Sequence, residues 1–224
     1  MNEKLISDYY HFTELYDRLI YRKKIGIQKN FTIQELKIKI NNLSNIYNKK
    51  KEQMVFADGN PKSNLMIIGE APGANEEKFH RPFVGEAGKL LDKMLSAINL
   101  DRDSVYITNV INYRPPDNRK PTSDEINLFL PYLKEHIQLI NPRLILLLGS
   151  TALEAFFNKE YSITKIRGTW LKIKIKNKVF NCLPSFHPAF LLRQPEQKKQ
   201  SWTDLQIIRD RLKEIKKNES NEKN

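Results

Sequence analysis

The stretch that decides the fold is residues 69–88, which read GEAPGANEEKFHRPFVGEAG. It follows an apolar run at residues 65–68 (LMII) that is typical of a buried strand, and it leads into a helical pattern. Open α/β sheets bind their ligands in loops of this kind, at the carboxyl ends of strands. The sequence therefore predicts one wall of a ligand pocket here. Four side chains of this loop suit such a pocket: Glu76, Glu77, His80 and Phe83.

Strands and helices alternate along the rest of the chain. Further runs typical of strands occupy residues 105–110, 144–148, 170–175 and 179–183. Helical apolar spacing occupies residues 87–98, 122–140, 151–157 and 202–215. Capping-box signatures begin two of these helices, at Thr122-x-x-Glu125 and Thr151-x-x-Glu154. The alternation predicts an α/β fold, a three-layer α/β/α domain around a central, mostly parallel, four-stranded sheet.

The first 52 residues precede this pattern and read as two helices. The capping-box signature Thr32-x-x-Glu35 begins the second helix, and the triplet at residues 49–51 (KKK) is typical of a solvated helix end. We expect a helical extension over residues 1–52, an α/β domain over residues 53–215, and a charged, flexible tail over residues 216–224.

Charge and composition limit the partners and the setting. The net charge of +12 favours nucleic acid or an anionic membrane, although a general richness in Lys, Asn and Ile could raise it without such contacts. No run of about 18 apolar residues occurs, and the N-terminus lacks the apolar core of a signal peptide, so we expect no membrane span and a cytoplasmic protein. The single cysteine, Cys182, excludes an internal disulfide and fits a small buried strand residue.

Polar loops follow three of the expected strands, at residues 69–88, 109–119 and 185–193. In a parallel sheet these loops leave the same edge, so they should converge on one site. A Walker A phosphate loop is absent, because Phe83 and Leu90 stand where its first glycine and its hydroxyl residue belong. The sequence also contains no G-x-G-x-x-G, so a nucleotide hydrolase is disfavoured.

Four blocks of sequence lie in these loops. They are residues 69–77 (GEAPGANEE), 81–85 (RPFVG), 109–119 (NVINYRPPDNR) and 187–193 (HPAFLLR). Together they resemble the family 4 uracil-DNA glycosylases, in the same order and with similar spacing, over about residues 55–212. The resemblance implies a monomeric enzyme that flips uracil out of single- or double-stranded DNA and hydrolyses its N-glycosidic bond, which starts base excision repair.

The resemblance also assigns a base-binding set. His187 would donate to uracil O2, where negative charge develops as the base leaves. Phe83 would stack on the base. Asn109 would read the base edge, because an amide suits O4 and N3–H of uracil and mismatches cytosine. Ala71 and Asn118 complete the uracil-binding residues that we expect.

Water activation and DNA contacts follow from the same resemblance. Other branches of the superfamily carry a catalytic Asp where this chain has Ala71, so Glu76 is expected to orient the water and Glu70 to shape the pocket. Both carboxylates could instead be solvated helix caps. The phosphates would be held by Arg114, Arg119 and Arg193. Leu191 or Leu192 would wedge into the gap that the flipped base leaves.

Two departures from the family stand out. Family 4 enzymes typically hold a [4Fe–4S] cluster through four cysteines, and the matching positions here are Asn42, Asn45, Tyr113 and Phe129. We therefore expect no cluster, no other cofactor and no metal; packing by the two aromatic residues and the N-terminal helices would replace its bracing. His80 stands where the family usually has glycine, and we expect it at the surface or on DNA.

Two other functions stay open at this point. The chain could be a non-catalytic module that binds uracil or single-stranded DNA, with its activity lost alongside the cluster. It could also be a glycosylase for another deaminated base. Asn109 favours uracil, and the intact His187 favours activity.

Overall fold

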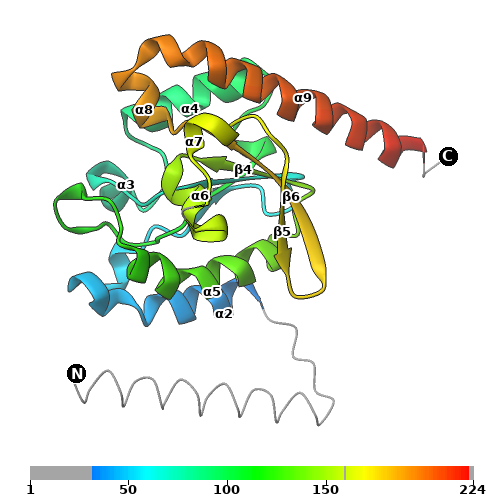
Figure 1. Ribbon diagram of the computed structural model, residues 1–224. Helices are drawn as coiled ribbons and strands as arrows, with labels where there is room; N and C mark the ends of the chain where they lie inside the picture. Colours follow the sequence, from blue (N-terminus) through cyan, green and yellow to red (C-terminus); the bar gives the residue numbers. More distant parts are fainter. Residues whose placement is uncertain (1–31, 159, 222–224) are drawn as a thin grey trace, which may run out of the picture. The chain divides into compact units, whose positions relative to one another are not determined.

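The computed structural model describes residues 32–158 and 160–221 (Figure 1). Ile33–Asn224 form one compact unit, and Met1–Thr32 are divided from it. The first helix predicted within residues 1–52 lies outside the described residues. Among the described residues, no helix combines the length and the apolar character needed to cross a membrane.

A mixed sheet runs through this unit in the order β1-β3-β2-β4-β6-β5. The strands are β1 (Ala57–Gly59), β2 (Leu65–Gly69), β3 (Tyr106–Asn109), β4 (Leu144–Leu148), β5 (Leu171–Ile175) and β6 (Lys178–Ser185). The central four, β3-β2-β4-β6, pair in parallel. Strands β1 and β5 pair antiparallel at the two edges. The predicted α/β fold with four parallel strands is confirmed, and an antiparallel strand extends each edge.

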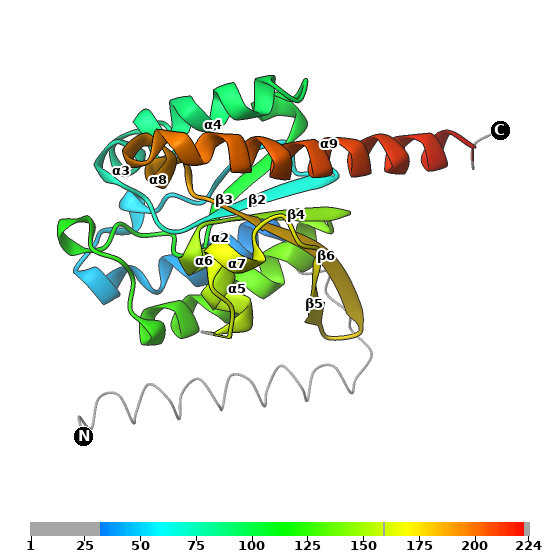
Figure 2. The same cartoon turned by 45° about the horizontal axis from the view of Figure 1, so that its top comes forward.

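Helices cover both faces of the sheet (Figures 1 and 2). On one face lie α4 (Glu86–Ser96), α8 (Pro188–Arg193) and α9 (Lys198–Asn221). On the other face lie α2 (Ile33–Asn41) and α5 (Ser123–Ile140), with α6 (Ser150–Phe157) beside α5. The shorter elements are α3 (Ala74–Phe79), α7 (Ile163–Ile166) and the 3₁₀ turns η1 (Ser44–Tyr47), η2 (Lys51–Gln53), η3 (Arg102–Ser104), η4 (Pro116–Asn118) and η5 (Pro195–Gln197).

Alternate residues of the strands point into the two helical layers, as the period of two in a strand requires. Leu65, Ile67 and Leu146 belong to the core shared with α4, α8 and α9. Tyr106 points to the opposite layer, where its hydroxyl lies 2.8 Å from Nε2 of His136 in α5. Burial lowers the pKa of His136 to about 3, so this histidine is a neutral member of the core.

Two helix boundaries differ from the expected ones, and the second of the expected N-terminal helices packs on the α/β domain. Helix α2 packs on α5, with Lys39 Nζ 3.2 Å from Glu135 Oε2, so residues 33–52 lie in the same compact unit as the sheet. Helix α9 continues to Asn221, so it includes the first six residues of the predicted tail. The Thr122 capping box is confirmed, but α6 has Gly149 as its N-cap because the Thr151 hydroxyl bonds elsewhere.

Candidate active site

Three loops meet at one end of the sheet, as the parallel topology requires. Gly69 at the end of β2 pairs with Asn109 at the end of β3, and β6 joins them through β4. Figures 1 and 2 both show α3, the loop after β3 and α8 at this end. The predicted convergence of these loops is confirmed.

Phe83 and Asn109 lie against Gly69, and His187 lies against Phe83. A Cβ atom on Gly69 would lie 2.4 Å from both Asn109 Oδ1 and Phe83 Cζ, so only glycine fits. The rings of Phe83 and His187 stack, with centroids 5.4 Å apart. Phe83 adopts a left-handed backbone with φ of 55°, a costly conformation for an aromatic residue. Arg102 donates a hydrogen bond to the Phe83 carbonyl and so helps to hold this conformation.

The Asn109 side chain is buried but unpaired. It is 3% exposed, and within residues 32–158 and 160–221 its amide makes no hydrogen bond. Asn112 is as deeply buried, yet its Nδ2 donates to the carbonyls of Val55 and Phe56 at 3.0 and 3.3 Å. Because Asn112 is paired and the Asn109 amide has no partner among the described residues, the contrast marks Asn109 as a group available for a ligand with both a donor and an acceptor.

His187 is held as a neutral donor. It caps α8, and its Nδ1 accepts a hydrogen bond from the Ala189 backbone N–H at 3.2 Å. The ring proton therefore lies on Nε2. Burial lowers the pKa of His187 to about 4; the positive charge of Arg193 acts in the same direction and Glu76 opposes it. At neutral pH the site thus presents an uncharged Nε2–H.

Behind His187, a buried ion pair fixes the end of β6. Ser185 Oγ donates to Asp204 Oδ2 at 2.6 Å, and Arg167 Nε donates to the same oxygen at 3.0 Å. Arg167 Nη2 donates to the other carboxylate oxygen. Ser185 and Asp204 are both fully buried. Gly168 makes room for this pair, because its Cβ would lie 2.5 Å from Asp204 Oδ1.

The two candidate carboxylates have different surroundings. Glu76 accepts three backbone hydrogen bonds, from Gly73 at 3.1 Å and from Val84 and Gly85 at 2.9 and 2.8 Å. It therefore ties the start of α3 to the loop that carries Phe83. Glu70 Oε2 accepts from the Thr151 hydroxyl, while its Oε1 accepts no hydrogen bond from any described residue.

Comparison with known proteins identifies the family of this site. The profile of the uracil DNA glycosylase superfamily matches residues 56–209, which include all six strands of the sheet. The chain belongs to the uracil-DNA glycosylase superfamily. The resemblance to the type-4 branch is also confirmed.

Type-4 uracil-DNA glycosylases from three organisms are similar to this chain. The protein from Sulfurisphaera tokodaii is 45% identical over 161 residues, which are 70% of this chain and 73% of that protein. The protein from Thermotoga maritima is 42% identical over 147 residues, 64% of this chain and 73% of that protein. The protein from Archaeoglobus fulgidus is 37% identical over 164 residues, 71% of this chain and 82% of that protein.

Three other residues expected at the site are half-buried or exposed. Ala71 is half-buried and follows Glu70 directly. Asn118 is exposed, and its Oδ1 accepts from Arg114 Nε at 2.7 Å. Arg119 is exposed and donates to both carboxylate oxygens of Glu125, at 2.8 and 2.5 Å. Both arginines of this loop are thus paired within the protein.

Helix α8 carries the expected DNA contacts, with one correction. Leu191 is fully buried in the core with α4 and α9, so it cannot act as the wedge. Leu192 is 44% exposed on the same helix, and Arg193 is exposed beside it. Adjacent residues point about 100° apart on a helix, and here Leu191 faces the core while Leu192 faces outward.

His80 ends α3 in the left-handed conformation, with φ of 52°. This explains the glycine that the type-4 resemblance places here, since glycine adopts that conformation without strain. Histidine is among the residues that tolerate it best. The side chain is exposed, as predicted.

The positions that match the cluster ligands do not fit an iron–sulfur cluster. Tyr113 and Phe129 are fully buried, and the Tyr113 hydroxyl donates to Asn41 Oδ1 at 3.1 Å. Asn42 and Asn45 are exposed amides. The chain has one cysteine, and no group of three or more His, Cys, Asp or Glu among the described residues could hold a metal ion. A cluster needs thiolate ligands, which these positions cannot supply.

Proposed function

We propose that this protein is a uracil-DNA glycosylase that flips uracil out of DNA and hydrolyses its N-glycosidic bond, starting base excision repair. The carrying observation is the buried amide of Asn109, which has no hydrogen-bond partner among residues 32–158 and 160–221, next to the stacked rings of Phe83 and His187. The membership of the chain in the superfamily supports the same reaction.

Base recognition falls to two side chains. Stacking on Phe83 would recover part of the few kcal/mol that flipping a base costs. The Asn109 amide would donate to uracil O4 and accept from N3–H. Cytosine presents a donor and an acceptor in the opposite places, so its binding would leave the buried amide unsatisfied.

Bond cleavage depends on His187. As the bond between the sugar C1′ and uracil N1 breaks, negative charge collects on the base and reaches O2. The neutral Nε2–H of His187 would donate to O2 most strongly at that stage, which lowers the barrier. Water then adds to the electron-poor C1′ and gives up a proton, which neutralises the departing uracil anion, so the products are an abasic site and free uracil.

The contacts of the two glutamates favour Glu70 as the residue that orients the water and Glu76 as the residue that shapes the pocket, the reverse of the expected roles. Glu76 uses both oxygens to hold backbone N–H groups, whereas Glu70 keeps one oxygen available. We expect Glu70→Gln to lower kcat with unchanged thermal stability, and Glu76→Gln to lower the melting temperature as well, because its loop loses charge-assisted bonds. Single-turnover rates and melting curves of both variants test this. A normal kcat for Glu70→Gln would instead assign the orientation of the water to Glu76.

DNA would be held by the basic surface around the site. Arg114, Arg119 and Arg193 would contact phosphates, and Leu192 would fill the gap in the stack. The net charge of +12 suits a polyanionic partner. Action on single- or double-stranded DNA, a monomeric state and a cytoplasmic setting stay predictions.

No iron–sulfur cluster is expected in this glycosylase. The buried Tyr113 and Phe129 occupy the space of two ligand positions, and their packing would take over part of the cluster's bracing. The purified protein should be colourless, with no visible cluster absorption and no stoichiometric iron. Iron in a one-to-four ratio of chain to metal would overturn this proposal.

The function is tested with single- and double-stranded oligonucleotides that contain uracil, hypoxanthine or xanthine, followed by alkaline cleavage. Cleavage at uracil alone is the expected result. Cleavage at another base instead would identify a different glycosylase. Binding of the uracil strand without cleavage would identify a non-catalytic module.

A further inference from the structure

The loop that carries two of the expected DNA contacts has an unusual backbone. This loop, residues 113–119, is called the arginine loop below. Asp117 and Asn118 both adopt the left-handed conformation, each with φ of 53°. Asp and Asn tolerate this conformation better than most other residues, and side-chain contacts from two sides add to the hold on the loop.

One tether reaches the arginine loop from Lys49 through Glu77 of α3. Lys49 Nζ lies 2.7 Å from Glu77 Oε1, and Arg114 Nη1 lies 3.6 Å from Glu77 Oε2. Arg114 Nε then donates to Asn118 Oδ1 at 2.7 Å. The left-handed Asn118 is thus linked through side chains to a lysine 69 positions earlier. Glu76 points its carboxylate into the Phe83 loop, so the two adjacent glutamates of α3 serve two different loops.

A second tether holds the other end of the loop. The Arg119 guanidinium lies over the Tyr47 ring, 5.8 Å from its centroid, and forks onto Glu125. Arg119 lowers the pKa of Glu125 to about 2, so this carboxylate is ionised at neutral pH. Burial and the negative charge of Glu125 both raise the pKa of Tyr47.

We propose that residues 44–49 form a brace for the arginine loop, in which Lys49 and Tyr47 are positioning residues for DNA binding. The inference rests on the proposed function and deepens it. The segment begins two residues after Asn42 and contains Asn45, two of the positions that match cluster ligands, and the loop it holds begins at a third, Tyr113. In this chain, ion pairs and a cation–π contact tie together the same segments.

Burial makes the Lys49 tether stronger than an ordinary surface ion pair. The side chains of Lys49, Glu77 and Arg114 are 18%, 14% and 27% exposed. Salt and water screen such partly buried pairs less than fully exposed ones. Lys49 is therefore not the solvated helix end that the KKK triplet suggested. Lys51 of the same triplet is exposed and makes no ion pair with any described residue, which makes it a matched control.

The test compares Lys49→Met, which keeps the length of the side chain, with Lys49→Arg and Lys51→Met. In DNA-free protein, amide hydrogen exchange at residues 113–119 should be faster in Lys49→Met than in wild type. With uracil-containing DNA, its KM should rise about tenfold while kcat stays near wild type, because the loop positions DNA and not the reacting bond. Lys49→Arg should restore both values, and Lys51→Met should match wild type in both.

Two results would overturn the brace. If amide hydrogen exchange of the arginine loop is unchanged in Lys49→Met, Lys49 does not hold the loop. If KM rises in the same variant, Lys49 contacts a phosphate directly instead. An equal effect of Lys51→Met would reduce the role of Lys49 to general charge. Because exchange is measured without DNA, it decides on the brace even if wild-type protein fails to excise uracil, which would refute the proposed function alone. Melting curves confirm that each variant is folded.

Discussion

Replacing His187 by alanine should slow uracil excision by about a hundredfold to a thousandfold, with KM close to that of wild type. The Nε2–H of this histidine is fixed by the hydrogen bond that Nδ1 accepts from Ala189, so the donor needs no reorganisation when charge reaches uracil O2. Its contribution therefore belongs to the transition state, and its loss should appear in kcat. Single-turnover rates on a uracil-containing single strand measure it.

His80→Ala is the control for this variant. His80 lies on an exposed helix end, so its loss should leave kcat unchanged whatever it does to KM. If His187→Ala kept a near-normal kcat, the donor role would be wrong, and the stacked ring would be a packing element for Phe83.

The pH dependence follows from the same histidine. Its pKa in the folded protein is about 4 against 6.5 without the protein environment, so the neutral donor persists at every pH above about 5. The His187 contribution to kcat should thus be flat from pH 5 to 8 and decline as pH approaches 4. Between those two pKa values the unfolded chain binds more protons, so stability should also fall as pH drops from 6.5 towards 4. His136 acts in the same direction.

Much of this site was predictable from sequence because it depends on local patterns and topology. Apolar runs alternating with helices predict parallel strands, and parallel strands bring their following loops to one edge. That argument alone places Phe83, Asn109 and His187 near each other. It does not predict which amide side chain is hydrogen-bonded. Only the structure shows that Asn112 is paired while Asn109 has no partner among the described residues.

The features of the site that the sequence did not predict depend on contacts between segments that are distant along the chain. Thr151 fits a helix cap locally, but its hydroxyl bonds Glu70, 81 residues away, in the folded protein. The sequence left the wedge open between Leu191 and Leu192, because only the rotation of this six-residue helix decides which leucine faces the core. Asp204 did leave a signal: it is a charged residue within the apolar face of α9, between Ser201 and Ile208. A charge in that place requires a buried partner.

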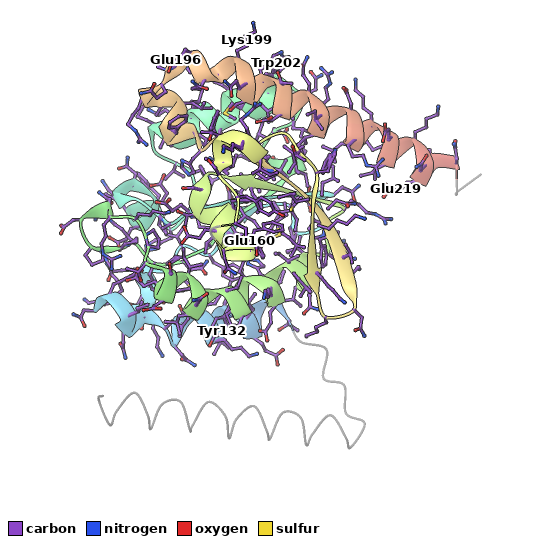
Figure 3. All side chains as sticks on the ribbon, viewed as in Figure 1. Tyr132, Glu160, Glu196, Lys199, Trp202 and Glu219 are labelled. Atoms are coloured by element: carbon purple, nitrogen blue, oxygen red, sulfur yellow. The ribbon has the colours of Figure 1, made fainter. Side chains whose placement is uncertain are left out.

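Replacing Asp204 by alanine should give the largest loss of stability, about 3–5 kcal/mol in the free energy of unfolding. Asp204 is fully buried, whereas Lys199 and Trp202 project from the outer side of the same helix (Figure 3). The variant leaves the Arg167 guanidinium, with a side chain only 15% exposed, without its carboxylate. It also frees Ser185, two residues before His187, so kcat should fall as well. Urea unfolding and single-turnover rates measure the two effects.

A double-mutant cycle separates the ion pair from simple packing. Arg167→Met leaves Asp204 buried without a cation; burial already raises the pKa of Asp204, so this variant can take up a proton and should lose less stability at pH 5 than at pH 8. The single variant Asp204→Leu and its combination with Arg167→Met complete the cycle; the double variant removes both charges and should recover part of the loss, because no unpaired charge stays buried. Asp210→Asn, on the exposed side of α9, should leave both stability and rate unchanged. Additive losses in the cycle would mean that Asp204 matters through its volume, and that the end of β6 is held by packing alone.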